Sequence, residues 1–268
     1  MIELAFQLIL EFLWIAMYII APALFLYVAN EAWYRGFHQH TRRVELSTGL
    51  VGVPVHELSH AIIAKLFGMK IIELALYRPD PQSRTLGYVN YSYQAGHAWH
   101  SIGRFFVGIA PLIGGSLAVL ALFHLTGLPK LTQYVTRPDL GVFVGLAGWL
   151  RDLATTIDTP AQIGALVLSI MIGTHASPSR SDMTGAASGL ISVLIVYLIY
   201  RLFTLALPEL ADRFIYPYFN LHAGAMDLAA LITQMAALGA IASGMLAALS
   251  FAFALKRKSS INDQVPSG

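Results

Sequence analysis

The sequence predicts an all-α polytopic membrane protein with about six transmembrane helices and a small membrane-associated β-hairpin. Three observations support this fold class. Apolar residues make up 56% of the 268-residue chain and charged residues 12%, whereas a soluble domain carries about 25% charged residues. Several apolar runs are long enough to cross a hydrocarbon core of about 30 Å. One stretch between two of these runs has the composition of paired strands.

Composition also limits the chemistry. The formal net charge is only +2 and the basic residues are scattered, so nucleic acid is not an expected partner. The chain contains no cysteine, which excludes disulfides, a thiolate nucleophile and sulfur ligands. Any bound metal must therefore be held by His, Asp, Glu or water. The expected surroundings are the lipid bilayer of a prokaryotic inner membrane, and the oligomeric state is left open.

The apolar runs define a single integral-membrane domain over residues 1–255. We expect its spans at about residues 12–30, 46–67, 105–125, 160–175, 183–200 and 228–255. The first span is expected to be retained, because the residues before it are acidic and offer no small-residue cleavage site. Residues 256–268 are polar and are expected to form a disordered tail.

Two segments between the spans have a different character. Residues 70–93 predict a β-hairpin, because two stretches rich in Ile, Leu, Val and Tyr flank a Pro-containing turn. Residues 142–157 predict a helix lying at the membrane interface, with Trp149 at its margin. The orientation stays open. Basic residues after the last span favour a cytoplasmic C-terminus, whereas an even number of spans would place Arg42 on the opposite side.

The sharpest chemical feature lies in the second predicted span, which reads His56-Glu57-Leu58-Ser59-His60. On a helix, residues four apart share a face, so His56 and His60 can bind one ion. Glu57 projects from the neighbouring face, close to a water on that ion. Two imidazoles, a third ligand and an open position suit zinc-dependent hydrolysis, with the glutamate as general base and then acid. Ionisable groups within a span are costly, so their presence indicates a function.

These residues, with the segment Ala64–Ile71 that follows, resemble the metal-binding helix of the site-2 proteases, a family of intramembrane zinc metalloproteases that cut transmembrane helices of other proteins. Ala110–Gly114 is similar to the family's Gly-Pro-x-x-Asn segment, with Ala and Gly at its ends. His175–Asp182 is similar to an Asn-x-x-Pro run that ends in Leu-Asp-Gly, with His in place of Asn. The resemblance implies Zn²⁺ as cofactor, a membrane-protein substrate, a membrane-associated sheet after the metal-binding helix, and a member without the PDZ insert.

The resemblance also implies that Asp182 is the third zinc ligand. Pro178 supports an irregular segment between two spans, and such a segment is tolerated at membrane depth only where it lines a cavity. The alternative is that Asp182 caps a helix starting at Met183. His175 is the second candidate ligand. Otherwise its imidazole is an oxyanion donor, as the resemblance implies for the family's Asn, or a helix-end residue bonded to a nearby carbonyl.

Other ionisable residues carry weaker signals. His97 and His100 are three residues apart, but their aromatic surroundings indicate a membrane-interface belt rather than a metal site. His222 and Asp227 form a reserve pair of ligands at the start of the last span. Glu11 lies in an apolar run near the edge of its span, where its carboxylate can reach headgroups.

The sequence therefore predicts an intramembrane zinc metalloprotease in which His56, His60 and Asp182 hold the metal and Glu57 activates the water. Two alternatives use the same residues: a metal-ion transporter, in which they form a transit site, and a non-catalytic membrane scaffold that the metal stabilises. We also expect an edge of the hairpin to pair with the substrate, because a helix can be cut only after it unwinds into an extended segment.

Overall fold

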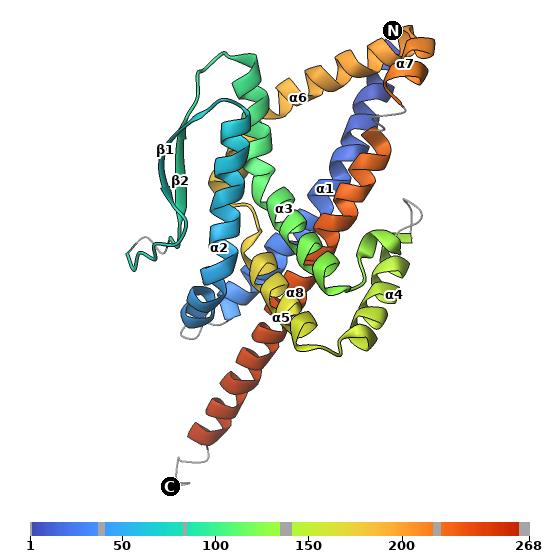
Figure 1. Ribbon diagram of the computed structural model, residues 1–268. Coiled ribbons are helices and arrows are strands. Elements are labelled where there is room, and N and C mark those ends of the chain that lie inside the picture. The colour runs from blue at the N-terminus through green and yellow to red at the C-terminus, as the bar shows by residue number, and fades with distance from the viewer. Residues whose placement is uncertain (1, 37–40, 83–84, 135–140, 217–220, 263–268) are drawn as a thin grey trace.

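The computed structural model describes residues 2–36, 41–82, 85–134, 141–216 and 221–262 (Figure 1). This part of the chain is mostly helical, with one small antiparallel sheet. The helices are α1 (Ile2–Gly36), α2 (Thr41–Leu66), α3 (Ala98–Thr126), α4 (Gly141–Thr156), α5 (Pro160–His175), α6 (Arg180–Ala206), α7 (Pro208–Phe214) and α8 (Leu221–Asn262), with a 3₁₀ turn η1 at Leu131–Gln133; the strands are β1 (Lys70–Ala75) and β2 (Tyr88–Ser92).

Four helices in the described part are long and apolar enough to cross a membrane. They contain the segments Phe6–Glu31, Ala98–Thr126, Arg180–Ala206 and Gly224–Met245. The predicted spans 46–67 and 160–175 also form helices, α2 and α5, but neither belongs to this group, and α5 has only 16 residues. The length and composition of four helices therefore indicate a membrane protein, and six such helices are not found in the described part.

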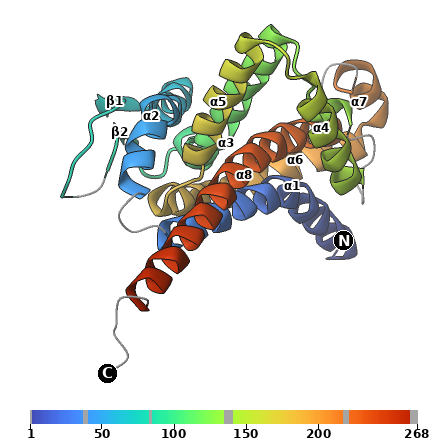
Figure 2. The same cartoon turned by 90° about the horizontal axis from the view of Figure 1, so that it is seen from below.

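The bundle is built around α3, which contacts α2, α5, α6 and α8, while α1 and α8 lie side by side (Figures 1 and 2). Helices α5 and α6 follow each other along α3. Near the end of α3, Gln162 Nε2 donates to the Thr126 carbonyl (3.3 Å), and near its start Gly189 lies against the backbone of Phe105. The irregular segment 176–179 that joins α5 to α6 therefore lies beside the middle of α3. Helices α5 and α6, which the sequence predicts as two separate spans, therefore run one after the other in the same direction along α3. Two consecutive spans would instead run in opposite directions.

The predicted hairpin over residues 70–93 is present. Strands β1 and β2 pair antiparallel with Lys70 opposite Ser92 and Ala75 opposite Tyr88, and the register shifts by one residue near Ile71. The sheet packs against α2, as Figure 1 shows. Because it has only two strands, each strand keeps one unpaired edge within the described residues.

Polar side chains connect the long helices inside the apolar bundle. Asn30 of α1 donates to the carbonyl of Thr174 in α5 (3.0 Å) and accepts from Ser243 of α8 (2.8 Å). Glu11 of α1 forms an ion pair with Arg201 of α6 (3.0 Å), so its carboxylate has a partner within the protein. Hydrogen bonds of this kind hold membrane helices together, because burial of apolar surface provides little driving force in lipid.

Two expectations about the edges of the fold are wrong. The polar tail predicted over residues 256–268 is helical up to Asn262, because α8 continues past the apolar run, and the remaining residues lie outside the described part. Trp149, predicted at the margin of an interfacial helix, is fully buried in the core, where its Nε1 donates to the Pro129 carbonyl (2.7 Å). Helix α4 turns this indole inward against the end of α3.

A glycine in α2 permits the closest contact between α2 and α5. A Cβ on Gly52 would lie 2.8 Å from Cβ of His175 and would overlap the Met171 carbonyl. We expect Gly52→Ala to lower the stability by about 1–3 kcal/mol, as overpacking of a tight contact does. Thermal unfolding in detergent measures this. Gly164→Ala on α5 is the matched control, because a Cβ there meets nothing within 4 Å, and an unchanged melting temperature for Gly52→Ala would contradict the packing.

Candidate metal centre

The two histidines of the sequence motif point at each other. Helix α2 places His56 and His60 one turn apart, with ring centroids 4.8 Å apart and a distance of 3.1 Å between their Nε2 atoms. Side chains at this spacing lie on one helix face. The motif thus presents two imidazole nitrogens to one point, as the sequence predicts.

The opposite nitrogens of both rings are bound to backbone carbonyls. Nδ1 of His56 lies 2.7 Å from the His175 oxygen, and Nδ1 of His60 lies 2.8 Å from the Val107 oxygen. A carbonyl oxygen can only accept, so each Nδ1 carries the ring hydrogen. In the neutral rings both Nε2 atoms therefore present lone pairs to each other at 3.1 Å. Histidines that bind a metal are held in this way by outer hydrogen bonds that fix the tautomer.

Asp182 brings a carboxylate to the same point. Its Oδ1 lies 3.3 Å from Nε2 of His60, and its Oδ2 lies 3.7 Å from Nε2 of His56. The carboxylate also accepts a hydrogen bond from the Ser179 backbone N–H (2.7 Å), which forms a capping box at the start of α6. The predicted alternative, in which Asp182 is the N-cap of a helix that starts at Met183, is wrong. The cap itself is Ser179 rather than Asp182, because α6 begins at Arg180 and not at Met183.

The three side chains form a group with the dimensions of a metal site. Their ligand atoms all lie within 4.8 Å of one another. In a tetrahedral zinc site with metal–ligand distances of about 2.0–2.1 Å, neighbouring ligand atoms lie about 3.3–3.4 Å apart. The separations of 3.1, 3.3 and 3.7 Å bracket this value. Two imidazole lone pairs and a carboxylate are also the donor set that Zn²⁺ accepts, so the residues fit the ion that the sequence predicts.

Glu57 lies next to this group but is not part of it. The side chain is 9% exposed and within electrostatic range of His56, His60 and Asp182. In the described part of the chain no hydrogen bond to its carboxylate is recorded, which distinguishes it from Asp182. A buried carboxylate without a protein donor is available to hydrogen-bond a water, as a general base requires.

Close packing of α3 against α2 and α6 sets the depth of the site. A Cβ on Gly108 would lie 2.6 Å from the Ala186 nitrogen and would overlap the Asp182 carbonyl, and one on Gly114 would overlap the Ser59 hydroxyl. Gly108 follows Val107, whose carbonyl holds His60. The small residues of the segment Ala110–Gly114 and its surroundings thus let the helices that carry the three donors approach one another.

His175 is near the site but outside the three-donor group. Its Nε2 is 2.8 Å from the Thr48 hydroxyl, and its carbonyl, not its ring, reaches the site through His56. The structure therefore does not place its imidazole as the alternative ligand. The carbonyls of His175 and Val107 hold the two imidazoles, a role that the sequence did not reveal, because backbone groups leave no signature in residue identity. The Thr48 hydroxyl was missed for another reason, since its partner His175 lies 127 residues away in the sequence.

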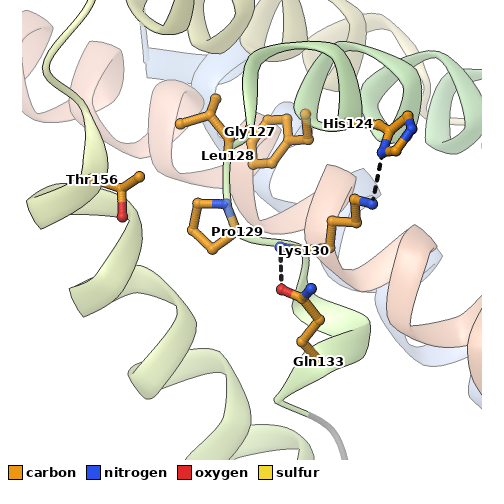
Figure 3. Close-up of a pocket in the computed structure, with 8 residues that line it drawn as sticks. His124, Gly127, Leu128, Pro129, Lys130, Gln133 and Thr156 are labelled. Carbon is orange, nitrogen blue, oxygen red and sulfur yellow. Dashed lines mark hydrogen bonds between the residues drawn. The ribbon is translucent and has the colours of Figure 1, made fainter.

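The remaining histidines have other contacts or lie outside the described side chains. Nδ1 of His97 accepts the backbone N–H of His100, and Nδ1 of His100 accepts that of Gln94, just before α3. His124 accepts a hydrogen bond from Lys130 at a cavity of about 340 Å³ beyond the end of α3 (Figure 3). The side chain of His222 lies outside the described part, as do His38 and His40.

An apolar cleft of about 400 Å³ lies beside the candidate site. It is enclosed by α1, α3 and α6, and its lining includes Gly108, Pro178 and Met183, which adjoin Asp182 in space or in sequence. The cleft exists because α1 packs mainly on α8, and α6 mainly on α3. Its lining comes within one residue of Asp182, at Met183.

Comparison of the chain with protein-family models, with curated proteins and with solved structures found no match.

Proposed function

We propose that this protein is an intramembrane zinc metalloprotease, which hydrolyses peptide bonds in or near the transmembrane segments of other proteins. One observation supports this most strongly. Two Nε2 lone pairs and a carboxylate converge within hydrogen-bonding distances, while both Nδ1 atoms are committed to carbonyls. Three electron-pair donors face one another stably only around a cation, and a glutamate next to them adds the group that hydrolysis needs.

In this proposal His56, His60 and Asp182 would hold Zn²⁺, which supplies a Lewis acid for the peptide carbonyl and lowers the pKa of a water to about 7. Glu57 accepts the proton of the attacking water as its oxygen adds to the carbonyl carbon. The same carboxylic acid then gives the proton to the amine nitrogen as the C–N bond breaks. Carbonyls of His175 and Val107 keep both imidazoles oriented during these transfers.

The surroundings of the site favour a membrane-embedded substrate. The apolar cleft between α1, α3 and α6 has almost no polar lining and ends at Pro178 and Met183, beside Asp182. An apolar helix that enters such a cleft exchanges its contacts with lipid for equally favourable contacts with apolar side chains. The side chains of His56 and Asp182 are each 14% exposed, so water also has access to the donor group.

The hairpin offers a place for the unwound substrate. Tyr91 of β2 packs against the buried cluster of Ala64, Met69 and Val107 next to the site and lies within electrostatic range of Asp182. An unpaired strand edge can bind an extended peptide through main-chain hydrogen bonds. The substrate would therefore add to the edge of β2 or β1 before it is cut.

Proline replacements test the strand pairing. In residues 86–92, proline at positions whose N–H points away from the partner strand should slow cleavage about two- to tenfold, because one main-chain hydrogen bond contributes about 0.5–1.5 kcal/mol. Alanine at the same positions keeps the N–H and is the matched control. Peptide cleavage and zinc content are measured together. Equal losses for proline and alanine would remove strand addition from the proposal.

The proposed function is tested by metal analysis and cleavage on the same preparation. The detergent-purified protein should contain about one zinc per chain and should cut members of a panel of single-span peptides. A chelator should stop cleavage, and added Zn²⁺ should restore it. A protein that binds zinc but cuts no peptide, and that loses only thermal stability with the chelator, would be the scaffold alternative instead.

A further inference from the structure

We infer that His175 and Thr48 form a positioning pair that aims the His56 ring at the metal. This inference rests on the proposed function, because it assigns these residues a role at the same site. Neither residue contributes an atom to the three-donor group. Their effect is transmitted through the His175 carbonyl, which receives the Nδ1 hydrogen of His56 at 2.7 Å.

The hydrogen bonds define the direction of this chain of contacts. The Thr48 hydroxyl lies 2.9 Å from the Val44 carbonyl of its own helix and 2.8 Å from Nε2 of His175. We assign the single hydrogen of the hydroxyl to the Val44 carbonyl, which can only accept. With this assignment the hydroxyl oxygen accepts from the Nε2–H of His175. The His175 residue is then held at both ends, by its ring to α2 at Thr48 and by its carbonyl to α2 at His56.

The position of His175 in its helix explains why the ring must be anchored. It is the last residue of α5, where carbonyls have no partner within the helix and are free to turn. Two other contacts hold this turn in place: Gly52 packs against His175 so closely that an added Cβ would lie 2.8 Å from Cβ and 2.7 Å from Cδ2 of His175, and Asn30 binds the neighbouring carbonyl of Thr174. The bond to Thr48 is the one contact of this set that uses the imidazole nitrogen.

The same hydrogen bonds argue against the two other roles predicted for the His175 ring, a zinc ligand and an oxyanion donor. A ligand would direct a lone pair at the donor group, but Nε2 is bound to Thr48. An oxyanion donor would need a second N–H, and a neutral imidazole that donates from Nε2 has none on Nδ1. His175 does end a helix, as the third prediction states, but its ring bonds to the Thr48 hydroxyl and not to a carbonyl.

The test replaces each end of the pair. Thr48→Val removes the hydroxyl with little change in volume, and His175→Phe removes the ring nitrogens. Thr233→Val on α8 is the matched control, because Thr233 makes the same bond to a carbonyl one turn earlier but lies outside the site. Zinc affinity is measured by competition with a chelator, and the Co²⁺-substituted protein is compared by visible absorption, which reports the ligand geometry.

Loss of an outer hydrogen bond typically weakens metal binding about 10–100-fold. His175→Phe keeps the carbonyl that binds His56 and loses only its anchor, so we expect a loss at the lower end of this range. We expect a smaller loss for Thr48→Val and no further loss in the double variant, because both act through one contact. The Co²⁺ spectrum should change in both, and Thr48→Ser should restore it. Thr233→Val should match the wild type.

Three results would overturn the inference. Zinc affinity and Co²⁺ spectra like those of the wild type in both single variants would show that the pair positions nothing. Complete loss of zinc in His175→Phe, with normal binding in Thr48→Val, would make His175 a ligand. Independent, additive losses would show that the two residues act separately. Failure of the proposed function looks different, since the wild-type protein itself would then bind no zinc or cut no peptide.

Discussion

Glu57→Gln should slow peptide cleavage by about 10²–10⁴-fold, the contribution of a general acid–base residue, while zinc content stays at the wild-type level. The amide keeps the size of the side chain but cannot take a proton from water. Because Glu57 lies outside the three-donor group, its loss removes no ligand. The measurement is the cleavage rate of a single-span peptide together with metal analysis of the same sample.

Glu45→Gln is the matched control for this experiment. It makes the same chemical change on the same helix, but Glu45 pairs with Arg42 at the start of α2, away from the donors. Cleavage by Glu57→Gln at the wild-type rate would mean that another group activates the water. If instead the wild-type protein cuts nothing but carries zinc across proteoliposomes, and Glu57→Gln alters that flux, the metal-transporter alternative would replace the protease.

Asp182→Ala should weaken zinc binding by more than about 100-fold, a larger effect than the loss of an outer hydrogen bond, and should abolish cleavage at ordinary zinc concentrations. Two imidazoles alone leave the ion without the third protein ligand that a catalytic zinc site needs. His175→Ala should bind zinc more tightly than Asp182→Ala, because it leaves all three donors in place. Chelator competition measures both affinities.

Part of the effect of Asp182→Ala comes from the lost capping box, so Ser179→Ala serves as the control. That variant removes the acceptor of the Asp182 backbone N–H and should cost about 0.5–2 kcal/mol of stability with zinc affinity largely preserved. If Asp182→Ala keeps its zinc while His175→Ala loses it, the third ligand is His175. Equal zinc loss in Ser179→Ala and Asp182→Ala would show that the start of α6, rather than the carboxylate, holds the site.

Local sequence was sufficient for the parts of the site that one helix defines. His56 and His60 are four residues apart, and helical periodicity alone brings them together, as the 3.1 Å contact between their Nε2 atoms shows. The hairpin over residues 70–93 was predicted for a similar reason, because strand composition and turn residues are read over short distances. Tertiary contacts do not easily reverse such signals.

Other expectations failed where the outcome depended on distant segments. Hydropathy predicts that residues 160–175 and 183–200 each cross the membrane independently. In the structure α5 and α6 follow each other along α3, because of contacts such as the hydrogen bond of Gln162 to Thr126. Trp149 was expected at the interface, and packing against the end of α3 buries it. Hydropathy gives the preference of a segment for lipid but contains no information about its neighbours.

By itself, the sequence determined that this chain belongs in a membrane and that one helix face carries two imidazoles with a carboxylate beside them. Only the tertiary structure decided which group stands opposite. The tight contact at Gly52 brings the end of α5 against α2, and the one at Gly108 brings the start of α6 against α3, so that Asp182 faces both rings and the His175 carbonyl holds one of them. The physical reason is that a helical repeat is encoded within a few residues, whereas a meeting of residues 56 and 182 depends on how whole helices pack.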